Sequence, residues 1–284
     1  MEAGAGVAAT ATATGRVVVI TSGKGGVGKT TSTAALGAAF AQNGERVAVI
    51  DFDIGLRNLD LVLGAERRVV FDLINVIQGV AKLPQALIRD RRLENLYLLP
   101  ASQTRDKEAL TDQGVADVIA ELRTTFDWII CDSPAGIERG ATLAMRHADL
   151  AIIVTNPEVS SVRDADRIIG LLDSKTERAE RGDCVDKHLL ITRYQAARAT
   201  RGDMLAIDDV LDILAIPLIG IVPESEEVRR ASNVGSPVTL NKATSSPALA
   251  YFDVMRRLKG EAIPMIVPRE SRGIFNQLFA WKAA

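Results

Sequence analysis

Residues 22–33 read SGKGGVGKTTST and continue a short β-branched run, RVVVITS, at 16–22. The stretch satisfies two phosphate-binding patterns, Gly-x-Gly-x-x-Gly at 23–28 for dinucleotides and Gly-x-x-x-x-Gly-Lys-Thr at 23–30 for nucleoside triphosphates. In both patterns a glycine-rich turn joins a buried strand to a helix, whose first backbone N–H groups face an anion. A second lysine, Lys24, lies where neither pattern requires a charge. The stretch therefore predicts a strand–loop–helix phosphate site and leaves its ligand and its extra lysine to be explained.

Residues just outside the glycines decide between the two ligands. Lys29 can reach β- and γ-phosphates and the Thr30 hydroxyl can ligate Mg²⁺, whereas a dinucleotide fold needs neither group. The run DWIICD at 127–132 ends in Asp132, an acid placed to support Mg²⁺ at the end of a strand. Asp51, which ends RVAVID at 46–51, also suits a ribose-binding acid. The longer pattern together with Asp132 outweighs that reading and predicts a nucleoside triphosphate with Mg²⁺.

The composition of the chain indicates a globular protein and argues against several other classes. The chain has 284 residues, 47% of them hydrophobic, and a formal charge of −2. This is ordinary globular composition, and a slightly acidic chain lacks the broad basic surface of most nucleic-acid binders. Cys131 and Cys184 have no metal-site spacing and favour a reducing compartment. No apolar run is long enough to span a membrane.

Apolar runs alternate with amphipathic stretches along the chain. We expect strands at 16–22, 46–51, 95–100, 127–132, 149–156, 187–192 and 216–223, and helices at 29–43, 111–125, 138–147, 160–173, 203–214 and 246–259. This alternation is typical of an α/β fold with a mostly parallel twisted sheet covered by helices on both faces. We expect a disordered tail at 1–15, a nucleotide-binding domain at 16–263 and a proline-bounded linker at 264–270.

The last segment, 271–284, has the pattern of an amphipathic helix. Most of its apolar residues share one helical face; they are Ile274, Phe275, Leu278, Phe279 and Trp281. The pattern alone leaves open whether this helix packs on the core or is free, and its position after two prolines favours a free tail. The few basic residues in and next to the segment are opposed by Glu270, so its attraction to a negatively charged surface would be weak.

Several motifs resemble those of one family. GKGGVGKT at 23–30 is similar to the deviant Walker A loop of the MinD/ParA ATPases, in which the early lysine reaches the nucleotide of a dimer partner. The resemblance narrows to the MinD branch, the cell-division-site ATPases. It does so through DFDIGLRNLDL (51–61) and CDSPAGIE (131–138), which look like the two switches, and through NPEVSSVRDADR (156–167), TRGDMLAIDDVLDIL (200–214) and IVPESEEVRRASNVGSPV (221–238).

The resemblance implies a Mg²⁺-dependent ATPase and assigns roles to individual residues. Lys24 and Lys29 would act on the phosphates, and Asp53 would position the attacking water. Mg²⁺ would be held by Thr30, supported by Asp132 and reached through a water by Asp51. The ATP-binding residues expected in the loop are Gly23, Lys24, Gly25, Gly26, Val27, Gly28, Lys29, Thr30 and Thr31, and those expected at the base are Thr192, Arg193, Pro223 and Glu224. Adenine is expected from the resemblance alone.

The resemblance also implies a cycle. ATP would make a homodimer whose two tails insert into a lipid surface, and hydrolysis would release it. The expected partners are a MinC-like division inhibitor and a MinE-like activator, which would share a face containing Arg57, Asn58 and Asp166. The implied location is the cytoplasm and the inner face of the bacterial cell membrane, with the chloroplast stroma and inner envelope as the alternative.

Two other functions stay open. A ParA-like DNA-partitioning ATPase would share the lysines, but Ile54 and Gly55 replace the proline–glutamine pair that usually follows the switch acids in that group. An ATPase that positions a polar structure such as a flagellum would share the motifs as well.

Overall fold

The computed structural model describes residues 14–103, 107–241 and 243–268. The predicted membrane helix at 271–284 and most of the predicted tail at 1–15 lie outside these residues.

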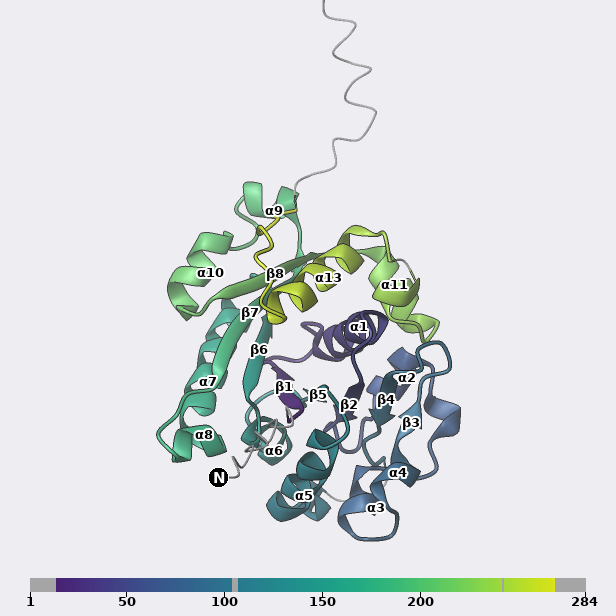
Figure 1. Ribbon diagram of the computed structural model, residues 1–284. Coiled ribbons are helices and arrows are strands. Elements are labelled where there is room, and N and C mark those ends of the chain that lie inside the picture. The colour runs from purple at the N-terminus through teal and green to yellow at the C-terminus, as the bar shows by residue number, and fades with distance from the viewer. Residues whose placement is uncertain (1–13, 104–106, 242, 269–284) are drawn as a thin grey trace, which may run out of the picture.

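The described residues form one eight-stranded sheet in the order β3-β4-β2-β5-β1-β6-β7-β8 (Figure 1). The strands are β1 (Arg16–Thr21), β2 (Val47–Asp51), β3 (Ile88–Arg89), β4 (Leu96–Leu99), β5 (Trp128–Asp132), β6 (Leu150–Thr155), β7 (Asp186–Tyr194) and β8 (Leu218–Pro223). All neighbours pair in parallel except β3 and β4. The predicted mostly parallel sheet is confirmed.

Helices cover both faces of the sheet, which explains why its central strands are continuous apolar runs. The helices and 3₁₀ turns are α1 (Lys29–Gln42), α2 (Leu59–Leu63), η1 (Glu66–Arg68), α3 (Leu73–Ile77), α4 (Leu83–Ala86), η2 (Lys107–Ala109), α5 (Asp112–Arg123), α6 (Arg139–Arg146), α7 (Val159–Lys175), α8 (Glu177–Glu180), α9 (Ala196–Thr200), α10 (Ile207–Leu214), α11 (Glu226–Asn233), α12 (Val238–Asn241) and α13 (Ser246–Leu258). One core lies under α1 and α13, and the other lies under α5, α6, α7 and α10. Each face of the sheet thus has its own core.

The expected elements are found within two residues at each end, with one exception. The helix predicted at 203–214 begins only at Ile207, because Gly202 turns the chain in the left-handed region (φ 76°) and the following residues are not helical. No elements were predicted between 52 and 94, where the structure has short helices and the two-residue edge strand β3. Elements this short complete too little of a period to produce a pattern.

The chain beyond α13 is attached to the sheet at its start. The guanidinium of Arg257 donates to the carbonyls of Ile219 (2.7 Å), Ile263 (3.1 Å) and Pro264 (2.7 Å). The first residue of the predicted linker is therefore held beside β8. Among the described residues, no helix combines the length and the apolar character that a membrane crossing requires.

Candidate nucleotide-binding site

The phosphate loop connects β1 to α1 at the centre of the sheet. Gly26 and Gly28 have φ values of 77° and 105°, a region that glycine enters without steric cost. Gly23 packs so closely on α7 that a Cβ there would lie 2.3 Å from the carbonyl oxygen of Asp164. These glycines bend the loop around the N-terminus of α1, where the helix dipole and unpaired backbone N–H groups favour an anion.

Lys29 lies at the first position of α1 and is buried. Its Nζ donates to Oγ of Ser22 at 2.9 Å. Burial lowers the pKa of Lys29, and the charges of Asp132 and Asp53 act in the opposite direction. A buried ammonium at the start of this helix is well placed to bind a phosphate. The negative charge of the phosphate would stabilise the ammonium, which burial has removed from water.

Two carboxylates meet at the carboxyl ends of neighbouring strands. Asp51 of β2 and Asp132 of β5 are register partners, and both are buried. Burial raises the pKa of Asp51 to about 8, and the charge of Asp132 adds to the effect. Burial also raises the pKa of Asp132 to about 7, against the hydroxyls of Thr30 and Thr33, which bond to it, and the charge of Lys29. A positive charge bound beside the pair would therefore stabilise both carboxylates in their ionised form.

This donor set fits Mg²⁺. Mg²⁺ prefers oxygen ligands, keeps several waters and is usually held by one or two carboxylates together with substrate phosphates. The Thr30 hydroxyl lies against Asp132, and Oγ1 of Thr33 donates to Oδ1 of Asp132 at 3.1 Å. The two oxygens of Asp51 accept the backbone N–H groups of Asp53 (2.8 Å) and Leu59 (3.1 Å), which leaves Asp51 suited to contact through water.

Lys24, the extra lysine, contacts a different part of the chain. Its Nζ donates to Oγ of Ser160 at 2.9 Å and lies 3.4 Å from Oε2 of Glu158, both at the start of α7. Its carbonyl oxygen accepts a bond from Oγ of Ser22 at 2.7 Å. The two lysines of the loop therefore have separate environments, since Lys29 lies in the buried acid cluster and Lys24 lies at a half-exposed ion pair.

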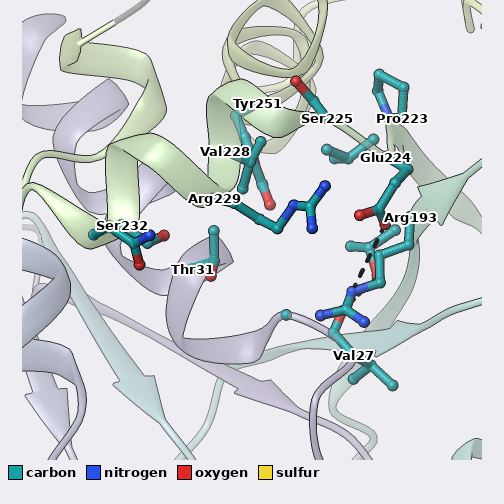
Figure 2. A pocket seen from close by; sticks show the side chains of 14 residues that line it. Val27, Thr31, Arg193, Pro223, Glu224, Ser225, Val228, Arg229, Ser232 and Tyr251 are labelled. Carbon is teal, nitrogen blue, oxygen red and sulfur yellow. Dashed lines mark hydrogen bonds and ion pairs between the residues drawn. The ribbon is translucent and has the colours of Figure 1, made fainter.

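A cavity of about 300 Å³ adjoins the start of α1 (Figure 2). All four residues predicted for the base, Thr192, Arg193, Pro223 and Glu224, line it, with Val27, Gly28 and Thr31 of the loop region. Oγ1 of Thr192 lies 2.6 Å from the carbonyl oxygen of Val27 and donates to it, which ties β7 to the loop. A nucleotide with its phosphates on the loop would have its base at this cavity.

The residues predicted to bind protein partners lie at the carboxyl edge of the sheet and on α7. Arg57 is only 16% exposed in its side chain and pairs with Asp60 at 2.8 Å, whereas Asn58 and Asp166 are exposed. The loop with Arg57 and Asn58 follows β2 and the helix with Asp166 follows β6. Because β5 and β1 separate these strands, a shared face would extend across three strand spacings, roughly 14 Å.

Several residues of the site had no role assigned from the sequence. Ser22 and Thr33 lie inside the opening stretch, where their hydroxyls could have been recognised as partners for a lysine and an acid. Glu158 and Ser160 lie inside NPEVSSVRDADR but have no motif of their own. Tyr251, whose hydroxyl lies 2.9 Å from Oγ of Ser32, is 219 positions away from it, and no local pattern links the two.

Comparisons with known proteins agree with this geometry. The family description "CobQ/CobB/MinD/ParA nucleotide binding domain" matches residues 18–238. The septum site-determining protein MinD of Escherichia coli (strain K12) is 58% identical over 267 residues, which cover 93% of this chain and 98% of that protein. A MinC:MinD cell division protein complex from Aquifex aeolicus is 42% identical and has a TM-score of 0.80, with 90% of this chain and 100% of that one covered.

A solved structure with a bound nucleotide is also similar. It is the septum site-determining protein MinD of Pyrococcus horikoshii complexed with Mg-ADP, at 32% identity and a TM-score of 0.75, covering 86% of this chain and 95% of that one. Identity of this extent across nearly the whole chain, on a shared fold with a phosphate loop at its centre, decides the family: this chain belongs to the septum site-determining MinD proteins of the CobQ/CobB/MinD/ParA nucleotide-binding family.

Proposed function

We propose that this protein is an ATP-driven membrane switch that places the cell-division site. It binds ATP with Mg²⁺, dimerises, attaches peripherally to the membrane and recruits a MinC-like division inhibitor. A MinE-like activator then promotes hydrolysis, and the protein is released. The observation that carries this proposal is the phosphate loop and its two lysines. Lys29 lies near the Asp51–Asp132 pair, and Lys24 lies apart from it at the start of α7. The MinC:MinD complex and the Mg-ADP complex among the related structures support the partner and the ligand.

Different residues of the site have different roles in ATP hydrolysis. Loop N–H groups and Lys29 bind the β- and γ-phosphates, and Asp132 and Thr30 fix the metal side of the site. Mg²⁺ supplies neutralisation of the charge that develops on the phosphates. Asp53 orients the water that attacks the γ-phosphate. Its backbone N–H is anchored to Oδ1 of Asp51 at 2.8 Å, so the loop that presents it is tied to the acid pair.

Exposed apolar side chains support a dimer at this edge of the sheet. Leu56, Ile137 and Val159 are 67%, 59% and 56% exposed, and they follow β2, β5 and β6, the strands around the phosphate loop. All three side chains lie at the carboxyl edge of the sheet, where a protein partner could remove them from water. A second copy placed here would cover them and bring each Lys24 toward the partner's nucleotide, so that ATP favours the dimer and the dimer favours hydrolysis.

The role of Lys24 gives the first prediction. Lys24→Ala should weaken ATP-dependent dimerisation and turnover much more than ATP binding to the monomer, because Lys24 lies away from the Lys29 cluster. Light scattering with a nonhydrolysable ATP analogue measures dimerisation. Lys175→Ala, at the far end of α7, removes an exposed lysine as a matched control and should dimerise normally. Normal dimerisation of Lys24→Ala would contradict the role in trans.

Membrane attachment through the predicted tail gives the second prediction. One amphipathic helix binds reversibly, and a dimer that presents two gains roughly 10²–10⁴ in avidity. An aspartate that enters the bilayer costs on the order of 2–3 kcal/mol at depth. Phe275→Asp should therefore abolish ATP-dependent sedimentation with liposomes and leave the unfolding temperature unchanged.

The control for this experiment is Asn276→Asp, which adds the same charge beside the predicted apolar face. It should keep most of the liposome binding.

A large drop in the unfolding temperature of Phe275→Asp, with sedimentation retained, would show a packed core helix instead of an anchor. Sedimentation of the parent with DNA instead of liposomes would favour the partitioning function.

A further inference from the structure

The cavity beside the start of α1, which is called the base cavity below, has an arginine on each of two walls. Arg229 belongs to α11, and Arg193 is the next-to-last residue of β7. Figure 2 shows both guanidinium groups extending into the space between these walls. The other lining is mixed: Val27, Val222 and Val228 give it apolar surface, and several hydroxyl, amide and carboxylate side chains give it polar groups.

Each arginine has an acidic partner, which comes from the chain after β8 for Arg193 and from α11 itself for Arg229. Arg193 adopts a left-handed backbone conformation (φ 53°) and lies 3.9 Å from Oε2 of Glu224. Arg229 pairs with Glu226, three residues earlier on the same helix. The bond runs from Nη2 of Arg229 to Oε1 of Glu226. Because the N–H donors of a guanidinium lie in its plane, this bond still allows another group to approach the flat face.

We infer that Arg229 stacks on the nucleotide base and is a residue that sets the affinity for purine triphosphates. A guanidinium over an aromatic ring is attracted by the ring's electron density and packs flat on it. A purine offers two fused rings to such a contact and a pyrimidine offers one. This inference rests on the proposed function, because it takes ATP as the ligand and the phosphate loop as its anchor.

The test compares three ligands, each with Mg²⁺: ATP, CTP and inorganic tripolyphosphate, which has no base. Titration calorimetry should show that Arg229→Gln lowers the affinity for ATP about 3- to 20-fold, the range expected for a partly desolvated cation–π contact. The affinity for CTP should fall less, and the affinity for tripolyphosphate should change by less than about twofold. In steady-state ATPase assays the effect should fall mainly on KM.

Two further variants separate stacking from charge. Arg229→Lys keeps the charge and loses the planar group, so its ATP affinity should lie closer to Arg229→Gln than to the parent. Arg230→Gln removes the neighbouring exposed arginine of α11, which does not line the cavity, and should bind all three ligands as the parent does. Unfolding temperatures without nucleotide should match, since Arg229 is exposed.

Three outcomes would overturn the inference. Equal losses for ATP and tripolyphosphate would make Arg229 a phosphate contact, and equal losses for ATP and CTP would place it on the ribose. Failure of the proposed function would look different, because the parent itself would then not bind ATP. A parent that binds ATP and an Arg229→Gln variant that binds it equally well would remove the stacking role alone.

Discussion

Lys29→Ala is expected to lower the affinity for ATP by roughly 10- to 100-fold. Lys29 is the buried ammonium of the site, and a hydrogen bond to a charged group contributes about 1.5–3 kcal/mol, where each 1.4 kcal/mol is tenfold. Its loss also removes the cation that lowers the pKa of Asp132, so Asp132 should hold its proton to higher pH and support Mg²⁺ less well. Both effects weaken the same complex.

Equilibrium binding of ATP at pH 7.5 with Mg²⁺ measures this effect. Ser22→Ala is the matched control, because it removes the hydroxyl that positions Nζ at 2.9 Å and keeps the charge; it should lose far less affinity. Thermal unfolding of both variants without nucleotide checks that they are folded. Affinity within a few-fold of the parent for Lys29→Ala would contradict the assignment of this loop as the triphosphate site.

How far the site could be predicted depends on how local each part is. The phosphate loop lies within eight consecutive residues, so its glycines, Lys29 and Thr30 could be assigned by position alone. Asp51 and Asp132 are 81 positions apart, yet each ends an apolar run, and parallel strands bring their carboxyl ends to one edge. The family resemblance placed both acids at the Mg²⁺ site, and the structure makes them register partners.

Other parts depend on packing that no local pattern contains. Arg229 and Tyr251 reach the cavity because α13 packs on α1 and α11 packs on α2 and α12, an arrangement set by long-range contacts. The sequence showed that Lys24 was surplus to its own loop, but its contacts with Glu158 and Ser160 come from a helix that follows a different strand. The short helices between 52 and 94 bury too few consecutive residues to show a helical pattern in the sequence, so they could not be predicted without the structure.

Asp53→Ala is expected to separate ATP binding from hydrolysis. Positioned acids and bases contribute roughly 10²–10⁴ to a rate, so turnover should fall by at least about 100-fold. ATP affinity should stay within a few-fold, because the loop, Lys29 and the acid pair are all retained. The anchor between the loop and β2 is also retained, since Asp51 accepts the backbone N–H of residue 53, and alanine keeps that group. The change therefore tests the carboxylate and nothing else in the loop.

The consequence for the cycle can be measured in the same preparation. A variant that binds ATP and dimerises but does not hydrolyse should stay on liposomes when the activator is added, while the parent is released. Asp53→Asn is the second variant: it keeps one oxygen acceptor for a water, so its turnover should lie between those of the alanine variant and the parent. If Asp53→Ala fails to bind ATP at all, the carboxylate is a ligand of the metal or the phosphates. Its place beside the Asp51–Asp132 pair, whose pKa values it raises, would then be part of the binding site rather than of the water-activating machinery.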